Sequence, residues 1–204
     1  DKGDTIIYDQ HIHASIRDGI RLSNARSFSF EHNNIDTLEK KLQQADGHIL
    51  VAIESVYSMD GDKAPLEKIV TICEKYKANI ILDEAHATGV TGENGEGLAQ
   101  SLNLESKIFA RIHTFGKAMG CHGAIVLGSE DLRQYLINFA RSFIYTTALS
   151  EHSLNTIESA YDKLKESGDL IKQLNQNISL FQSLLSKKLQ SKLISSSSPI
   201  QCIL

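Results

Sequence analysis

The stretch NIILDEAHATG, residues Asn79–Gly89, decides the fold. Its apolar run Ile80–Leu82 predicts a buried strand, and Asp83, Glu84 and His86 follow that run at once. A run that is apolar throughout, without alternation, is typical of a strand covered on both faces. The stretch therefore predicts a strand inside a parallel sheet that presents polar groups at its carboxyl end.

The same pattern continues on both sides of this stretch. Apolar strand-like runs alternate with segments whose apolar residues recur at helical spacing. Strands are expected over residues 5–9, 48–55, 79–84, 108–114 and 123–129, and helices over residues 13–23, 33–45 and 64–77. Because alternating strands and helices build parallel sheets, the sequence predicts an α/β fold with a mostly parallel sheet flanked by helices.

The pattern changes after residue 149. Two amphipathic helices are expected over residues 150–167 and 169–189, followed by a serine-rich turn and the start of another strand. We expect residues 1–166 to belong to a large α/β domain and residues 167–204 to be the truncated beginning of a smaller C-terminal domain. A last strand with an open edge also leads us to expect that the sequence is a central fragment of a longer protein.

The composition is that of an ordinary globular protein, with 204 residues, 41% hydrophobic residues and a formal charge of −4. No basic cluster runs through it, which argues against a partner with a phosphate backbone. The three cysteines, Cys73, Cys121 and Cys202, are far apart and form no CxxC pair, which indicates reduced thiols. With no transmembrane-length apolar run and no signal peptide, we expect a cytoplasmic protein without a membrane partner.

Polar residues follow four of the expected strands, at the point where each strand ends. They lie at Asp9–His13, Glu54–Ser58, Asp83–His86 and His113–Lys117. Open α/β sheets bind their ligands beyond the carboxyl ends of the strands. The sequence therefore predicts one site built from all four segments.

The letters ILDEAH also resemble a helicase strand, which is an alternative interpretation. It requires a phosphate-binding loop of the form GxxxxGK[ST]. The chain has one Gly-Lys pair, Gly116-Lys117, and Ala118 follows it. A nucleotide-driven function would therefore need a phosphate loop from outside this sequence.

Lys117 lies in HTFGKAMGCHG, residues His113–Gly123, just past a predicted strand. It could be an ordinary solvated loop lysine. If Phe115 and Met119 desolvate it, its pKa would fall, which is what an amine needs to form a Schiff base. Asp83, at the end of another strand, could keep a pyridinium nitrogen protonated. That pairing makes pyridoxal 5'-phosphate (PLP) an electron sink.

Five segments together carry a family resemblance, and they occur in the family's order. They are HASIRDG, FEHNNIDTLEKKL, ESVYSMDGDKAPLEKI, DEAHATGVTGENGEG and HTFGKAMGCHGAIVLGS. The sequence resembles the α-oxoamine synthases, PLP-dependent enzymes of fold type I, over nearly all of residues 1–150. The resemblance implies that residues 1–166 are part of the PLP-binding large domain.

The resemblance also implies roles for three central residues. Lys117 would carry the cofactor and then remove the α-proton of the substrate. Asp83 would pair with the pyridine nitrogen, and His86 would hydrogen-bond the phenolic oxygen. A buried structural histidine is the plainer interpretation of His86. Its position three residues after Asp83 favours the site.

Four further residues receive roles from the resemblance. His13 would stack on the cofactor ring, Ser58 would lie near the phenolic oxygen and Thr114 would bind phosphate. Thr147 would reach the phosphate of the partner subunit's cofactor in a homodimer. Ser58 could instead cap a turn, and His13 could pair with His11 on a metal, although no further ligand has usable spacing. We expect no metal, and no role follows for Glu54 or Glu84.

The implied reaction is a decarboxylating condensation of an amino acid with an acyl thioester of coenzyme A or an acyl carrier protein. The form HTFGKAMGCHGA resembles the branch that joins L-alanine to a pimeloyl thioester, giving 8-amino-7-oxononanoate for biotin biosynthesis. Glycine C-acetyltransferase activity and a catalytically incomplete fragment stay open. Relative to a full-length family member, the resemblance leads us to expect that these residues do not include the glycine-containing N-terminal segment or the C-terminal arginine. We therefore expect weak PLP binding and no useful catalysis from these residues alone.

Overall fold

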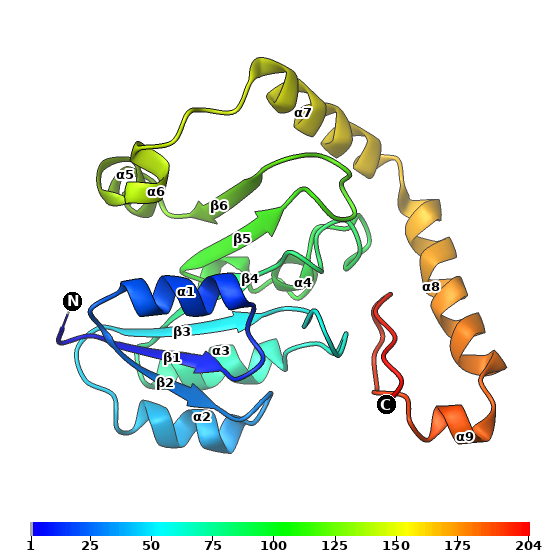
Figure 1. The fold of residues 1–204 in the computed structure, drawn as a ribbon, viewed down its shortest axis with the longest axis horizontal. Helices are drawn as coiled ribbons and strands as arrows, with labels where there is room; N and C mark the ends of the chain where they lie inside the picture. The colour runs from blue at the N-terminus through cyan, green and yellow to red at the C-terminus, as the bar shows by residue number, and fades with distance from the viewer. Residues whose placement is uncertain (1) are drawn as a thin grey trace.

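The computed structural model describes residues 2–204, and a six-stranded sheet lies at its centre (Figure 1). The strand order is β2-β1-β3-β4-β5-β6, parallel throughout except for the antiparallel β6. The strands are β1 Thr5–Asp9, β2 Arg26–Phe30, β3 Ile49–Glu54, β4 Asn79–Asp83, β5 Ala110–Thr114 and β6 Ala124–Gly128. The predicted α/β fold with a mostly parallel sheet is confirmed.

The sequence did not predict β2, which forms an edge of the sheet. Four of its five residues are exposed, and only Phe30 is buried. An edge strand with so little buried surface has a weak hydrophobic pattern.

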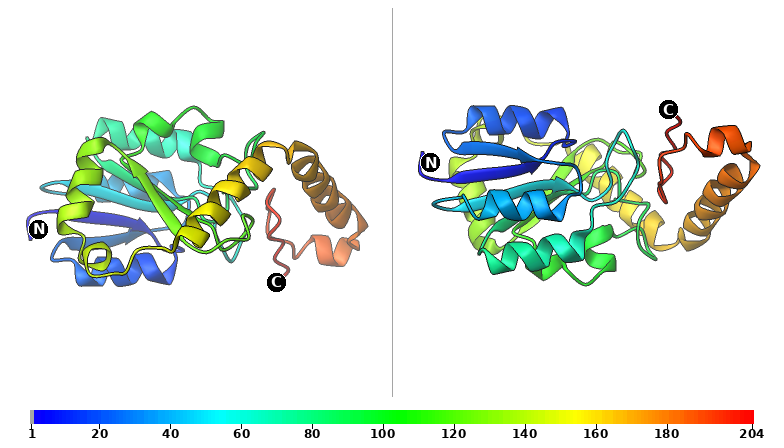
Figure 2. Two further views of the ribbon diagram at one scale, coloured as in Figure 1. Left: turned by 90° about the horizontal axis from the view of Figure 1, so that it is seen from above. Right: turned by 90° about the horizontal axis from the view of Figure 1, so that it is seen from below.

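Helices cover both faces of the sheet (Figure 2). One face carries α1, and the opposite face carries α2, α3 and α4. The nine α-helices of the described chain are α1 Ala14–Leu22, α2 Ile35–Leu42, α3 Leu66–Lys75, α4 Leu98–Ser101, α5 Glu130–Phe139, α6 Arg141–Ile144, α7 Glu151–Lys165, α8 Gly168–Leu184 and α9 Lys187–Gln190. Asn34 caps the start of α2, because its side chain accepts a hydrogen bond of 3.1 Å from Thr37 N.

The main core lies between the sheet and α2 and α3. Strand residues such as Ile7, Ile53 and Leu82 pack there against helix residues such as Leu38 and Ile69, all fully buried. Burying one such side chain contributes roughly 1.5 to 3 kcal/mol. Successive strand residues face opposite sides of a sheet, so residues next to these core positions project toward the α1 face.

The C-terminal part consists of α7, α8, α9 and a return segment. The helix break predicted at Gly168 is present, because α7 ends at Lys165 and α8 begins at Gly168. The prediction of a strand at the end of the chain is wrong, since the structure has only a single bridge there, between Leu193 and Ile203. Ser196 Oγ donates a hydrogen bond of 2.7 Å to the carbonyl oxygen of Gly61, which joins this segment to the sheet domain.

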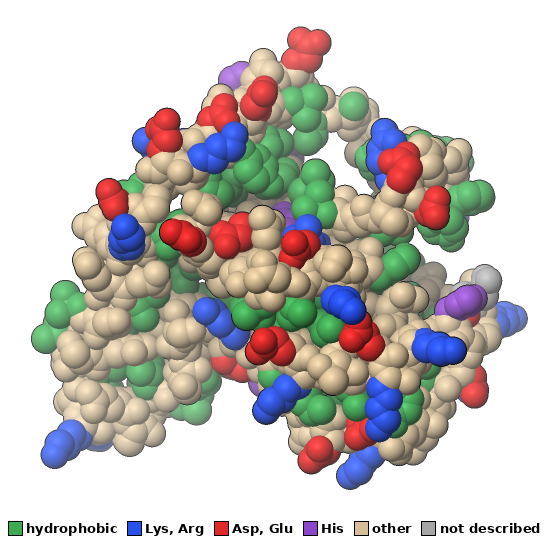
Figure 3. Space-filling model, turned by 180° about the vertical axis from the view of Figure 1, so that it is seen from behind, with side chains coloured by type: hydrophobic (Ala, Val, Ile, Leu, Met, Phe, Trp, Pro, Cys, Tyr) green, Lys and Arg blue, Asp and Glu red, His purple; other side chains and the backbone are tan. Residues whose placement is uncertain are grey.

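The surface mixes charges of both signs. On the face shown in Figure 3, the described Lys and Arg side chains lie among Asp and Glu side chains and form no continuous basic surface. None of the helices described here has the length and apolar character needed to cross a membrane.

Candidate active site

Four neighbouring strands bring their carboxyl ends to one edge of the sheet. β1, β3, β4 and β5 are adjacent and parallel, so the segments that follow them meet there. Asp83 lies opposite Glu54 on one side and Ile112 on the other. The predicted convergence of polar residues at this edge is confirmed.

Asp83 projects toward the α1 face of the sheet, because its neighbour Leu82 points into the core on the other face. Its Oδ1 accepts a hydrogen bond of 2.8 Å from the backbone amide of Ala85. Its Oδ2 has no donor among the residues that the structure describes. Asp83 and Thr114 line the same groove of about 410 Å³, whose other lining residues are mostly apolar. One carboxylate oxygen is therefore held in place while the other is available to a ligand.

His86 is half-buried and interacts electrostatically with three other predicted site residues. Burial lowers the pKa of His86, and the positive charge of Lys117 lowers it further. Asp83 raises the same pKa, and His13 lowers it. The imidazole is therefore neutral at pH 7, and Asp83, His86, Lys117 and His13 form one electrostatic group.

The sequence allowed two environments for Lys117, solvated or desolvated by Phe115 and Met119. The structure shows the first: Lys117 is exposed, while those two side chains are 3% and 9% exposed. The turn from Phe115 to Gly123 explains this, because hydrogen bonds of 2.8 Å from Cys121 N to Phe115 O and 3.0 Å from Gly120 N to Lys117 O close it. The apolar residues of the turn face inward and the lysine faces outward.

Thr114 and Ser58 both have hydroxyl groups without partners in the described chain. Thr114 ends β5, and its Oγ1 is buried without a hydrogen bond. Buried hydroxyl groups usually have a partner, so this atom marks a place for a polar ligand or water. The Ser58 hydroxyl makes no hydrogen bond to the turn that follows it. The interpretation of Ser58 as a turn cap is therefore not supported.

His13 is the N-cap of α1. Its Nδ1 accepts a hydrogen bond of 3.2 Å from Ser15 N, and the ring is exposed at the edge of the site. Thr147 is exposed in the segment between α6 and α7. No hydrogen bond among the described residues joins Thr147 to the rest of the site, so its role stays a prediction.

Glu84 has a structural function that the sequence did not indicate. Its two oxygens accept hydrogen bonds of 2.8 Å from Leu98 N and 2.9 Å from Ala99 N, at the start of α4. Burial raises the pKa of Glu84, and the two amides oppose that shift. The carboxyl satisfies helix amides that would otherwise lack partners.

A second polar cluster lies beside the site, where His11, His32 and Asp60 offer ligand atoms within 4.8 Å of one another. The two rings are stacked at 4.1 Å with an interplanar angle of 18°, so their lone pairs lie in two nearly parallel planes and do not converge on one ion. Both nitrogens of His32 also face carboxylates, at 3.0 Å from Asp9 and 2.8 Å from Asp62. The cluster is built as an ion-pair network.

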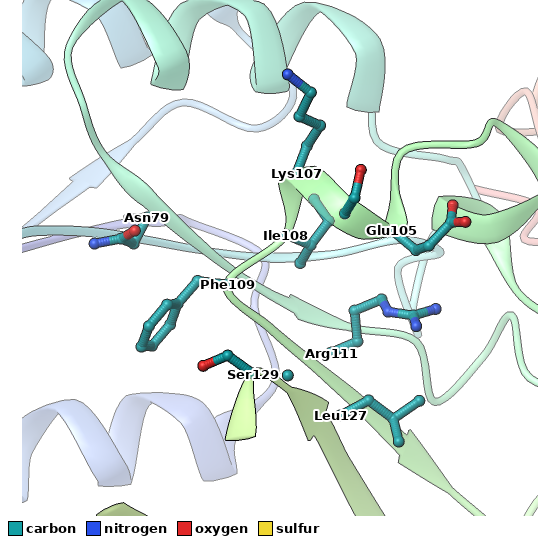
Figure 4. A pocket seen from close by; sticks show the side chains of 10 residues that line it. Asn79, Glu105, Lys107, Ile108, Phe109, Arg111, Leu127 and Ser129 are labelled. Carbon is teal, nitrogen blue, oxygen red and sulfur yellow. The ribbon is translucent and has the colours of Figure 1, made fainter. Parts of the chain in front are cut away.

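A pocket of about 660 Å³ lies at the opposite edge of the sheet (Figure 4). Asn79 begins β4 and Phe109 immediately precedes β5, so both mark the amino ends of the strands. Lys107, Arg111 and Ser129 also line it. The pocket includes none of the predicted site residues.

The family model "Aminotransferase class I and II" matches residues 1–204. The chain belongs to this family. The predicted resemblance to the α-oxoamine synthases is also confirmed, because several curated relatives of this chain are named 8-amino-7-oxononanoate synthase.

Two of these relatives illustrate the similarity. The protein from Emericella nidulans is 47% identical over 179 residues, which cover 80% of this chain and 43% of the relative. The protein from Lysinibacillus sphaericus is 43% identical over 177 residues, which cover 86% of this chain and 46% of the relative. The chain therefore spans about half the length of the curated relatives that it matches.

Solved structures show the same fold. A serine palmitoyltransferase from S. paucimobilis, with a bound PLP-myriocin aldimine, matches with a TM-score of 0.90 and 29% identity, covering 99% of this chain and 53% of that one. An 8-amino-7-oxononanoate synthase from Francisella tularensis matches with a TM-score of 0.80 and 36% identity, covering 90% and 53%. The predicted fold type I is confirmed.

Proposed function

We propose that the chain is the cofactor-binding part of a PLP-dependent acyltransferase that condenses L-alanine with a pimeloyl thioester to give 8-amino-7-oxononanoate. One observation carries the proposal. The charges of Asp83 and Lys117 both act on His86, so the three residues that the chemistry needs lie together at the carboxyl edge of the sheet. The relatives that are named 8-amino-7-oxononanoate synthase support the choice of reaction.

The residues at this edge fit PLP. Asp83 Oδ2 is available for a basic ring nitrogen. The buried Thr114 Oγ1 has no hydrogen-bond partner among the described residues, and a phosphate oxygen could be that partner. The neutral imidazole of His86 can donate a hydrogen bond to the phenolic oxygen. When bound, the cofactor supplies an electron sink for the negative charge that forms when a substrate proton is removed.

The residues of the chain would divide the remaining work. Lys117 would hold the cofactor through its ε-amine and would accept the α-proton of the substrate at Nζ. Because the Lys117 side chain is exposed, both the cofactor and the substrate can reach it. Asp83 would keep the proton on the ring nitrogen by its negative charge, and His13, fixed as the N-cap of α1, would cover one face of the ring. Ser58 would offer a hydroxyl group to the phenolic oxygen.

The solved structures that resemble this chain also include serine palmitoyltransferase. L-serine with a long-chain acyl thioester is therefore a second pair of substrates to test, although the curated relatives do not favour it. Glycine with acetyl-coenzyme A is the further pair within the family. Incubation with each pair, followed by mass analysis of the product, separates these reactions, and we expect the L-alanine and pimeloyl product from the complete protein.

The short length of the chain bears on activity. Because it spans about half of its curated relatives, we propose that it binds PLP weakly and has no useful turnover alone. Comparing its turnover with that of a version extended to the length of the relatives tests this point. Equal turnover of the two would contradict it.

Cofactor binding is tested by absorbance. Adding PLP is expected to give visible absorbance, and borohydride reduction followed by peptide mapping is expected to place the pyridoxyl group on Lys117. Lys117→Ala should remove both signals. Lys187→Ala, which changes an exposed lysine of α9, should leave them intact. A label on other lysines with Lys117 unmodified would contradict the assignment.

The assembly and the location complete the proposal. A homodimer is supported by exposed apolar side chains on and after α5 and α6, since such surfaces mark contact sites; they include Tyr135, Phe139, Phe143 and Tyr145. Light scattering of the complete protein tests the dimer. Three free cysteines fit the reducing conditions of the cytoplasm, which fractionation of cells would test.

A further inference from the structure

Glu54 is a buried glutamate at the candidate site, and the proposed function assigns it no role. It ends β3 and lies directly opposite Asp83 of β4 in the parallel register, so both side chains project from the same face. Its residue exposure is 2%, and its Oε1 accepts no hydrogen bond from a described residue. A buried carboxyl oxygen without a donor is costly, which indicates a function other than stability.

The surroundings of Glu54 are the candidate site itself. The backbone amides of His13 and Ser58 face its carboxyl and favour its charged form. Asp83 and Lys117 act on it through their charges, and the Tyr57 side chain also faces it. A single carboxyl therefore meets backbone amides of the loop after β1 and the loop after β3, and it interacts electrostatically with the charged pair of the site.

The contrast with Glu84 shows that burial alone does not explain Glu54. Glu84 is also fully buried at this edge, but both of its oxygens accept backbone hydrogen bonds at the start of α4. Glu54 has one oxygen that no donor of the described residues meets. Glu84 is satisfied by the fold, whereas Glu54 is directed toward the site.

We propose that Glu54 is a positioning residue of this site, which holds the loops of His13 and Ser58 and sets the negative charge beside Asp83 and Lys117. The role rests on the proposed function, because it concerns a cofactor bound between these residues. This positioning role does not require Glu54 to contact the substrate.

The charge of Glu54 changes near neutral pH. Burial raises the pKa of its carboxyl to about 7, and the neighbouring charge of Asp83 adds to this, while the His13 amide, the charge of Lys117 and the Ser58 amide oppose it. Below this pH Glu54 is neutral and places no second negative charge beside Asp83. Above it Glu54 places an added negative charge beside Asp83 and Lys117.

The first test needs no cofactor. Because the folded pKa is raised, the contribution of Glu54 to stability is fully present below its unfolded pKa near 4.5 and is lost as the pH rises through about 7. Relative to wild type, the Tm of Glu54→Gln should therefore rise by about 5 °C between pH 5 and pH 8. The exposed Glu67→Gln is the control and should show no such trend. A Tm difference that is constant with pH overturns the inference.

The second test uses the PLP-loaded chain and records visible absorbance against pH. Glu54→Gln should lower the midpoint for proton loss at the Lys117 nitrogen by about one pH unit, the order expected for a lost neighbouring charge. An unchanged midpoint contradicts the role of Glu54 alone. A wild-type chain that takes up no PLP contradicts the proposed function and, with it, the positioning role.

A third measurement tests the inference even if Glu54→Gln does not fold. The ¹³C-labelled carboxyl of Glu54 in the wild-type chain can be titrated by NMR without any substitution. A midpoint near pH 7 supports the inference. A midpoint near 4.5, the ordinary value for glutamate, overturns it.

Discussion

His32 and Asp62 lie in direct contact, with 2.8 Å between Nε2 and Oδ2, although they belong to different connections of the sheet. The opposite ring nitrogen lies 3.0 Å from Asp9 Oδ1 at the end of β1. Burial opposes the charged form, but the hydrogen bonds to Asp62 and Asp9 outweigh it and raise the pKa of His32 to about 10. One imidazolium therefore links the loops that lead to His13 and Ser58.

This link predicts a pH-dependent contribution to stability. Because the folded pKa of His32 is raised, the contribution is fully present below its unfolded value near 6.5 and is lost as the pH rises through about 10. At pH 6, His32→Gln should lower the free energy of unfolding by about 2 to 3 kcal/mol. Urea unfolding at pH 6 and pH 10 measures the difference. The exposed His152→Gln is the control, and a cost for His32→Gln that stays the same at both pH values would contradict the link.

The charge of Asp83 is expected to matter for cofactor binding and not for folding. Asparagine keeps an Oδ1 that can accept the hydrogen bond from Ala85 N, so Asp83→Asn should fold normally. Without the negative charge, a protonated ring nitrogen loses its partner, and the PLP affinity should fall at least about tenfold, or about 1.4 kcal/mol. Absorbance titration measures the affinity, with the exposed Asp131→Asn as control. Equal affinities of Asp83→Asn and wild type would count against the proposed role.

The sequence predicted the buried centre of the sheet and the edge at which the site lies. Ile80–Leu82 and its neighbouring runs are apolar enough to indicate strands, and Asp83 and His86 follow them directly. It could not predict contacts between distant segments. Glu84 meets Leu98 and Ala99, and His32 meets Asp62, only after the chain has folded. Lys117 was placed correctly at a strand end, but its exposure depends on the shape of a turn.

Glu84 gives a prediction that concerns the fold alone. A glutamine at this position offers one acceptor for the two amides of Leu98 and Ala99, and its NH₂ group would face the other amide. We expect Glu84→Gln to lower the free energy of unfolding by about 2 kcal/mol, through one unsatisfied buried amide. Urea unfolding at pH 7 tests it. The exposed Glu93→Gln nearby should stay within about 0.5 kcal/mol of wild type, and the same small effect for Glu84→Gln would contradict the capping role.

Gly61 tests how the C-terminal segment is attached. It has a φ of +73°, and an added Cβ would lie 2.3 Å from the carbonyl oxygen of Ile200 and 2.7 Å from Ser196 Oγ. Gly61→Ala should therefore displace the segment that the hydrogen bond from Ser196 fixes, and cleavage by trypsin after the exposed Lys192 should become faster. Gly19→Ala is the matched control, because a Cβ there meets no atom within 4 Å. If both variants are cleaved at the wild-type rate, the segment does not depend on the contact with Gly61.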